Sequence, residues 1–272
     1  MRWRRSFLTM AIVSAVTFNP LVGLADDLAR LRAATIKISN QGSTATGFVV
    51  SRSTDSQDVA VKILVTSAHV FEKAVGNQCK LVLRKPKQDG SYLRQELPVT
   101  IRSDHQPKWV RHPKVDVAAL ALTDIGDTEI PAIAYADLIG KAPIDKGIYS
   151  SGDSVWAFCF PAQLEANSAG FPILRRGSIA SFPIQPIEKH RTFLVDMSSF
   201  GGDSGAPVIV QNRSAKDKVQ PQFMVMGLVM GQQRETTKSV TPIEERTVHR
   251  SLGLAIAVHS EFIRQTVDQI SK

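Results

Sequence analysis

Short apolar runs separated by turn residues recur along most of the chain, and this pattern constrains the fold more than any other feature. The runs are rich in Val, Ile and Phe, and Gly, Pro, Asn or Asp interrupts them after a few positions. Segments such as 62–66, 155–160 and 206–210 are too short for typical helices but suit β-strands. Because the pattern continues through both halves of the chain, it predicts an all-β barrel or sandwich.

Two long excursions can be placed within this pattern. Residues 46–50 and 62–66 can pair as a hairpin, with the polar stretch 51–58 between them. Later, a charged insertion at 232–250 separates two predicted strands. We expect this insertion to form a hairpin or a mobile loop.

The end of the sequence changes from a strand-like to a helical period. Ile263, Val267 and Ile270 fall on one helical face. Ser260 precedes them and is expected to cap the helix, since its hydroxyl can accept a bond from a free backbone N–H group. The sequence therefore predicts a closing helix within 259–272.

The first 25 residues are predicted to be a secretory signal peptide. Residues 1–5 are basic, residues 7–18 form an apolar segment shorter than a membrane span, and residues 23–25 offer a small-x-small cleavage site. We expect cleavage after Ala25; an uncleaved N-terminal anchor is the alternative. Residues 26–272 are then expected to be secreted or periplasmic, with no stable membrane insertion.

The formal net charge of +8 raises the question of a nucleic-acid partner. The basic residues are scattered, and no basic tract is interleaved with aromatic residues. A stacking platform for single strands needs both features. We therefore expect a solvated basic surface and no nucleic-acid binding. The oligomeric state stays open.

Two cysteines, Cys79 and Cys159, occur in a chain expected to meet an oxidising compartment. We favour two buried free thiols over a disulfide, because free cysteine often behaves as a small core residue. The acids Asp124, Asp127 and Glu129 could suggest calcium, but a polar loop between strands is the better interpretation. We predict no metal and no cofactor.

Residues 201–207, with the sequence Gly-Gly-Asp-Ser-Gly-Ala-Pro, surround a hydroxyl group with glycines. A serine attacks a carbonyl carbon only when a base removes its proton and donors stabilise the oxyanion. The glycines leave Ser204 accessible and allow the N–H groups of Gly202 and Ser204 to meet in an oxyanion hole. Alone, the segment is equally compatible with a tight turn, because Gly, Asp and Ser are common turn residues.

Two upstream segments supply possible partners for this serine. The apolar run 64–70 carries His69 next to small residues, and Asp116 lies at the start of the apolar strand that follows His112-Pro113. In the order histidine, aspartate, serine, these three motifs resemble those of the chymotrypsin-like (trypsin-fold) serine proteases. Segments such as 47–49 look closest to the exported bacterial members, including the Deg-type proteases, although the chain has no room for a peptide-binding PDZ domain.

The resemblance implies two six-stranded antiparallel β-barrels with a C-terminal helix. The lobe at 26–145 would carry His69 and Asp116, and the lobe at 146–272 would carry Ser204. The catalytic triad implied is His69 as general base, Asp116 as its orienting acid and Ser204 as nucleophile. The other histidines are expected to be structural or at the surface; they are His105, His112, His190, His249 and His259.

The resemblance also implies where a substrate side chain would bind. Ser198 would form the floor of the primary specificity pocket, with Met230, Gly231 and Gln232 along one wall and Gly253 on another. None of these residues is acidic. A basic substrate side chain would have no charge partner there, so we expect an uncharged, small-to-medium apolar side chain before the scissile bond.

Two departures from the family pattern concern the support of the triad. Many relatives have a serine where Met230 stands, and its hydroxyl supports the catalytic aspartate. The start predicted for the mature chain, residues 26–28, lacks the Ile-Val-Gly-Gly type terminus that pairs with the acid before the nucleophile in animal members. We therefore expect Asp203 to be satisfied by local backbone or side-chain donors.

The activity implied is that of a secreted or periplasmic serine endopeptidase, which hydrolyses protein or peptide substrates through an acyl-enzyme intermediate. The alternative is a catalytically silent binding module with a trypsin-like fold. The sequence leaves the natural substrate open.

Overall fold

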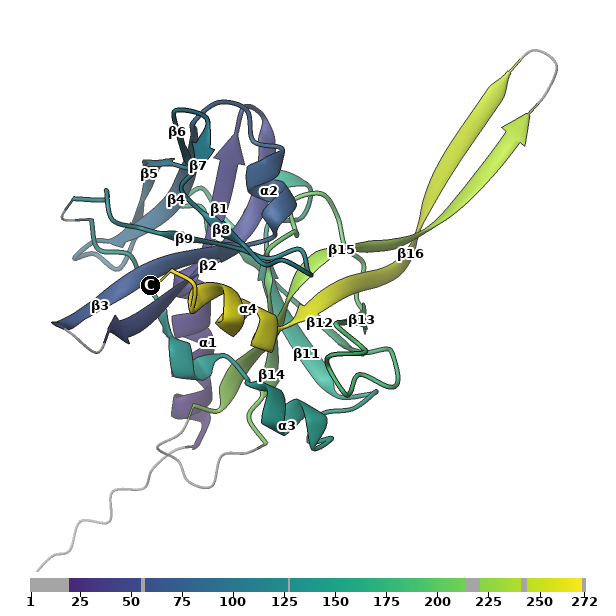
Figure 1. Cartoon of the computed structure of the whole chain (residues 1–272). Coiled ribbons are helices and arrows are strands. Elements are labelled where there is room, and N and C mark those ends of the chain that lie inside the picture. The colour runs from purple at the N-terminus through teal and green to yellow at the C-terminus, as the bar shows by residue number, and fades with distance from the viewer. Residues whose placement is uncertain (1–19, 55–56, 127, 214–220, 241–243, 271–272) are drawn as a thin grey trace, which may run out of the picture.

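The computed structural model describes residues 20–54, 57–126, 128–213, 221–240 and 244–270. Within these ranges the fold is all-β, with two groups of strands packed against each other and a helix after the last strand (Figure 1). The helices are α1 (Pro20–Ala34), α2 (Ala68–Glu72), α3 (Lys141–Asp145) and α4 (Ser260–Val267), with two short 3₁₀ turns, η1 (Tyr135–Asp137) and η2 (Pro161–Gln163).

The second group of strands forms a closed six-stranded antiparallel barrel, as predicted. Its strands follow one another around the barrel in the order β11 (Ser154–Cys159), β12 (Ile173–Ile179), β13 (Thr192–Asp196), β16 (Glu245–His259), β15 (Phe223–Val240) and β14 (Pro207–Gln211). Alternate residues such as Val155, Ala157 and Val208 are buried inside it. This alternation is the strand period that the sequence displays.

The first group of strands is a sheet with two ends rather than a second closed barrel. The hydrogen-bonded order is β5-β4-β1-β2-β3-β9-β8, with β10 beside β2. The strands are β1 (Thr35–Asn40), β2 (Ser43–Thr54), β3 (Gln57–Thr66), β4 (Gln78–Pro86), β5 (Tyr92–Thr100), β8 (Val110–Arg111), β9 (Ala118–Ala121) and β10 (Ile133–Ala134).

The reason for the open edge lies between β5 and β8. There the chain turns through Asp104 and His105, which both have positive φ, and forms its own small hairpin of β6 (Arg102–Ser103) and β7 (Gln106–Pro107). Strand β8 is only two residues long. The segment that would close a barrel therefore pairs with itself.

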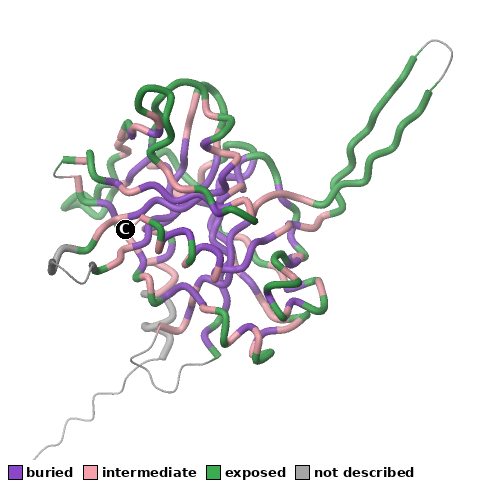
Figure 2. Tube along the Cα trace, viewed as in Figure 1, coloured by how far each residue is buried: buried purple, intermediate pink, exposed green. Residues whose placement is uncertain are grey.

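Both predicted hairpins are present. Strands β2 and β3 pair with Phe48 opposite Val65 and Val50 opposite Ile63. The charged insertion is the outer part of the β15–β16 hairpin, in which Arg234–Val240 pairs with Glu245–Ser251. We call this outer part the arm; it projects far from the rest of the molecule, and its described residues are exposed (Figures 1 and 2).

The closing helix is α4, and its predicted apolar face is correct for Ile263 and Val267, which are fully buried. The prediction that Ser260 caps this helix is wrong. The N-cap residue is His259, and the Ser260 hydroxyl instead donates to the carbonyl oxygen of Ile139 at 2.6 Å. A buried hydroxyl needs a partner, and the carbonyl from the interlobe connection meets that need.

A shared apolar cluster joins the two groups of strands. It includes Phe48 and Val65 from the first sheet, Ile209 and Leu228 from the barrel, and Phe262 from α4. A site between the lobes therefore has rigid walls on both sides. Cys79 and Cys159 are both buried and unbridged, in agreement with the sequence prediction.

The predicted signal segment falls mostly on residues 1–19, which lie outside the described residues, and the expected cleavage point after Ala25 lies within the range of α1. Across the described ranges, no helix has both the length and the apolar character needed to cross a membrane.

Candidate active site between the lobes

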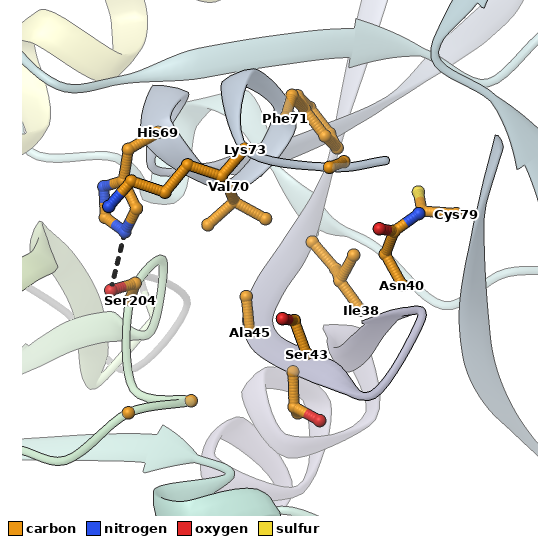
Figure 3. Close-up of a pocket in the computed structure, with 14 residues that line it drawn as sticks. Ile38, Asn40, Ser43, Ala45, His69, Val70, Phe71, Lys73, Cys79 and Ser204 are labelled. Carbon is orange, nitrogen blue, oxygen red and sulfur yellow. Dashed lines mark hydrogen bonds between the residues drawn. The ribbon is translucent and has the colours of Figure 1, made fainter. Parts of the chain in front are cut away.

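The three residues of the predicted triad lie in contact with one another. His69 is in α2, directly after β3; Asp116 precedes β9; and Ser204 lies in the turn before β14. The Nδ1 atom of His69 is 2.6 Å from Oδ2 of Asp116. The Nε2 atom of His69 is 3.0 Å from Oγ of Ser204, the contact drawn as a dashed line in Figure 3. Because a carboxylate only accepts hydrogen bonds, Nδ1 carries the proton and Nε2 is free to accept the hydroxyl proton of Ser204.

Asp116 is held by the residue that it orients. Its second oxygen, Oδ1, accepts a bond of 2.9 Å from the backbone N–H of His69. Burial raises the pKa of Asp116, but the two hydrogen bonds and the charge interaction with His69 outweigh burial and leave the pKa below its usual range. The carboxylate is therefore ionised at neutral pH, and it is supported although Met230 stands where many chymotrypsin-like proteases have a serine.

The loop before Asp116 has its own support, which the sequence analysis did not assign. The Nδ1 atom of His112 accepts bonds from the backbone N–H groups of Lys114 and Val115, at 3.1 and 3.2 Å. Its Nε2 atom is 3.1 Å from Oε1 of Gln265 in α4. His112 is buried, so it is a structural residue that ties the loop of Asp116 to the closing helix.

The turn of Ser204 requires glycine on both sides of the Asp203–Ser204 pair. Gly202 has a φ of +104°, and a Cβ atom there would lie 2.2 Å from the carbonyl oxygen of Phe160. Gly205 has a φ of +88°, and a Cβ atom there would lie 2.0 Å from the carbonyl oxygen of Thr46. Any side chain would therefore force the backbone apart at these two positions.

Thr46 of β2 clamps this turn from the other lobe. Its hydroxyl donates to the carbonyl oxygen of Gly202 at 2.7 Å, and its backbone N–H donates to the carbonyl oxygen of Ser204 at 3.0 Å. Both residues of the proposed oxyanion hole are thus fixed through their carbonyl groups. Within the described residues, the N–H groups of Gly202 and Ser204 donate to no protein atom, so both donors are available to an incoming oxyanion.

One oxygen of Asp203 is satisfied by a local backbone donor and a side chain, as expected, but its buried Oδ1 atom has no hydrogen-bond partner among the described residues. Its Oδ2 atom accepts bonds of 2.9 Å from the backbone N–H of Phe200 and of 2.9 Å from Nη1 of Arg175 in β12. The same guanidinium donates to the carbonyl oxygen of Ser198 and stacks over the Phe200 ring, 5.4 Å from its centroid. Burial raises the pKa of Asp203 even beside this cation. Arg175 therefore does not belong to the solvated basic surface that the sequence predicts.

Four of the residues predicted to line the primary specificity pocket lie on the paired strands β15 and β16, and Ser198 lies in the loop after β13. Gly253 of β16 has a φ of +75° and lies beside Ser198, whose Oγ would be 3.9 Å from an added Cβ atom. Met230, Gly231 and Gln232 follow one another along β15, where it leaves the barrel for the arm. Ser198 itself is exposed, and Met230 packs partly against the apolar cluster between the lobes.

A cavity that the sequence pattern did not predict opens next to Ser204. It has a volume of about 210 Å³, and its lining includes His69, Ser204 and Gly202 together with side chains from β1, β2, α2 and β4 (Figure 3). It lies on the first-lobe side of Ser204, and the residues predicted for the primary pocket are not part of its lining. A sequence signal existed in the small and apolar residues at facing positions of β1 and β2, where Ile38 pairs with Ala45.

Metal chemistry has no candidate site in the part of the chain that the structure describes, because no three His, Cys, Asp or Glu side chains cluster there. Burial raises the pKa of the Cys79 thiol to about 12, and it also raises the pKa of Cys159, so both thiols are neutral at neutral pH.

Comparisons with known proteins show a similarity in fold alone. No protein-family model matches the chain, and no curated protein matches it in sequence. Among solved structures, it is similar to a serine-to-alanine variant of Rv3671c from M. tuberculosis H37Rv in an inactive form, at 17% identity, with 95% of this chain and 97% of that chain covered and a TM-score of 0.48. It is also similar to the Rv3671c protease in an inactive form, at 17% identity, with 93% and 97% covered and a TM-score of 0.46. The chemical interpretation of the site therefore rests on the distances and hydrogen bonds described above, and not on these comparisons.

Proposed function

We propose that the chain is a serine endopeptidase of the chymotrypsin-like kind. The observation that supports this most directly is the unbroken series of contacts from Asp116 through His69 to Ser204, at 2.6 and 3.0 Å. Each of these side chains has the partner that its role requires. A tight structural turn would need the glycines but not a histidine and a buried carboxylate in line with the hydroxyl.

The proposed mechanism has two halves. Oγ of Ser204 attacks the scissile carbonyl carbon while Nε2 of His69 takes its proton, and the N–H groups of Gly202 and Ser204 receive the oxyanion. The imidazolium then gives its proton to the leaving nitrogen as the C–N bond breaks, and an acyl-enzyme ester remains on Ser204. Water repeats the sequence and regenerates the hydroxyl. A positioned base of this kind contributes about 10²–10⁴-fold, and each oxyanion donor about 10²–10³-fold.

For the residue before the scissile bond, we propose an uncharged, small-to-medium apolar side chain. The segment around Ser198 and Gly253 offers no carboxylate to a basic substrate side chain, and the nearby guanidinium of Arg175 is engaged with Asp203. A cleavage profile on a peptide library dominated by Lys or Arg at this position would contradict the proposal.

We also propose that the protein acts outside the cytoplasm, in the periplasm or as a secreted protein, on protein or peptide substrates. The support is the basic and apolar leader with its small-x-small site before Asp26. N-terminal sequencing of the exported protein should give Asp26 as the first residue. A start at Met1 would favour an uncleaved anchor.

Covalent labelling tests the proposed activity. A fluorophosphonate probe should label the parent at Ser204, and Ser204→Ala should abolish both the labelling and casein hydrolysis while keeping the fold. Ser178→Ala in β12 is the matched control, which should be labelled like the parent. A correctly folded parent protein without labelling or hydrolysis would favour the alternative, a binding module with a collapsed oxyanion hole.

A further inference from the structure

Ser43 and Thr44 of β2 add hydroxyl groups to the lining of the cavity beside Ser204, but most of its wall is apolar. The apolar part is formed by Ile38 of β1, Ala45 of β2, Val70 and Phe71 of α2, and Cys79 of β4 (Figure 3). Four of these residues are almost completely buried, and Val70 is half-buried. The neutral thiol of Cys79 behaves as a small apolar group. Apart from the exposed Lys73, the described lining contains no Asp, Glu, Lys or Arg side chain, so an apolar side chain entering the cavity meets few charges.

The side chain of Asn40, which also lines the cavity, is already engaged in holding the walls. The side-chain nitrogen of Asn40 donates to the carbonyl oxygens of Val75 and Gln78, at 2.9 Å each. Its Oδ1 atom accepts a bond of 2.8 Å from the backbone N–H of Val75. Asn40 thus fixes the loop between α2 and β4, and a polar substrate group would have to compete with these three bonds.

The position of the cavity identifies which part of a substrate would reach it. In the proposed mechanism the leaving nitrogen must lie at Nε2 of His69, since this atom returns the proton. Helix α2 continues from His69 directly into the wall through Val70 and Phe71. The primary-pocket residues lie along β15 and β16 in the other lobe. A chain that leaves Ser204 on the His69 side therefore passes over the cavity with its first side chain.

We propose that this cavity, which we call the leaving-group pocket, binds the side chain of the residue immediately after the scissile bond and selects a medium-sized apolar residue such as Leu, Ile or Val. The inference rests on the proposed function and extends it to substrate selection on the leaving-group side. At about 210 Å³, the pocket is smaller than a drug-sized site of roughly 300–1,000 Å³. It fits one side chain in place of about seven waters, each of which occupies about 30 Å³ in the liquid.

The rim of the leaving-group pocket adds a charge preference. Lys73, at the end of α2, lines the pocket and is exposed. The second residue after the scissile bond would pass this ammonium, so an acidic residue there is favoured over a basic one. Because exposed ion pairs contribute little, the expected preference is only a few-fold.

Acyl transfer isolates the leaving-group side from the rest of substrate recognition. Treatment with p-nitrophenyl acetate places an acetyl group on Ser204 and releases nitrophenolate as a burst. An amino-acid amide then competes with water: its nitrogen bonds to the acetyl carbon, the ester bond to Oγ breaks, and the amine proton passes through His69 to Oγ. The ratio of acetyl-amide to acetate, measured per acylated enzyme, reports how well each amide occupies the leaving-group side.

We expect leucinamide to compete roughly tenfold or more better than glycinamide, as burial of a Leu side chain predicts. Lysinamide should compete no better than glycinamide. Leucyl-aspartic amide should exceed leucyl-lysine amide by a few-fold, and Lys73→Gln should remove that difference. Equal partition of leucinamide and glycinamide, or a preference for lysinamide, would overturn the proposal.

Filling the pocket gives the second line of evidence. Ala74→Leu, at the rim, and Ala45→Leu, inside, should each reduce the advantage of leucinamide over glycinamide severalfold. Ala180→Leu, an exposed residue after β12, is the matched control and should keep the advantage of the parent. If both filled variants fold and keep the full advantage, the pocket does not bind this side chain. Absence of any burst in the parent would refute the proposed function itself, and a burst without amide selectivity would refute only the pocket.

Discussion

Replacing Arg175 with methionine should loosen the turn that carries Ser204, because Asp203 would lose its charged partner. The Asp203 side chain is 0% exposed and that of Arg175 is 17% exposed, with 2.9 Å between Nη1 and Oδ2. Removing one partner of a buried pair costs about 3–5 kcal/mol. Since the Phe200 N–H still bonds to the carboxylate, we expect the lower end, a loss of about 3 kcal/mol in the free energy of unfolding.

The same substitution should reduce activity. The Arg175 guanidinium holds both Asp203 and the carbonyl oxygen of Ser198, which flank the turn of the nucleophile. If the full loss acts on the turn, the equilibrium constant for the form with the oxyanion donors in place falls by about 100-fold, since 1.36 kcal/mol corresponds to one decade. Activity then falls by at most that factor, and by less if the turn of the parent is strongly favoured. The destabilisation should shrink at lower pH, because the raised pKa of Asp203 rises further without the cation and the neutral acid needs no charged partner.

Urea unfolding and active-site titration measure both effects, and the adjacent arginine supplies the control. Arg176 is exposed and lies over the Trp156 ring, with its guanidinium bonded to Ser154. Arg176→Met should change the free energy of unfolding by no more than about 0.5 kcal/mol. If the two methionine variants lose stability and titratable sites equally, the pair of Arg175 and Asp203 does not hold the turn.

Three further substitutions test the clamp, the orienting acid and a buried histidine. Asp116→Asn should lower turnover at neutral pH on the order of 10⁴-fold, because the wrong tautomer of His69 is then favoured; steady-state kinetics measures this. Thr46→Val removes the donor to the Gly202 carbonyl and should cost about 1–3 kcal/mol in urea unfolding, with a loss of turnover. Burial lowers the pKa of His259 to about 4. Below about pH 6.5 the unfolded chain binds a proton that the folded chain does not, so stability should fall by up to about 3 kcal/mol, and His259→Leu should flatten this decline.

Each of these results has a contrary outcome. A loss below tenfold for Asp116→Asn would mean that other groups orient His69. Thr237→Val, on the exposed arm, is the control for Thr46→Val, and equal stability of the two variants would contradict the clamp. If the unfolding midpoint of His259→Leu declines with pH as steeply as that of the parent, another group causes the acid sensitivity.

The meeting of His69, Asp116 and Ser204 at one site could be predicted because each of these residues lies in a recognisable local sequence pattern. The glycines around Ser204 and the apolar strand before His69 are local features. The structure requires the glycines because a Cβ atom would clash at Gly202 and Gly205, and the strand ends directly before the helix that carries His69. Arg175 could not be recognised in the same way. It precedes Arg176 in a sequence that marks both as basic, but successive residues of a strand point to opposite faces, so one meets buried Asp203 and the other meets solvent.

Features that depend on distant segments were the ones that sequence reasoning missed. In the sequence, Ser260 stands where its hydroxyl could cap α4. In the structure this hydroxyl instead donates to the carbonyl oxygen of Ile139, which comes from a distant segment of the chain. The leaving-group pocket combines residues from four elements, and its volume depends on how these elements pack. Closure of the first sheet likewise depends on whether the segment after β5 reaches a distant edge or folds on itself.

The arm has a consequence for where the chain can be interrupted. Each of its strands is anchored separately in the barrel: β15 through its pairing with β14 and β16 through its pairing with β13. A break between residues 240 and 245 would therefore leave the inner part of each strand hydrogen-bonded to its neighbour in the barrel, β15 to β14 and β16 to β13. New termini or an inserted domain at this position should leave the site between the lobes intact, because Ser204 and its supports belong to strands that the break does not separate from the barrel.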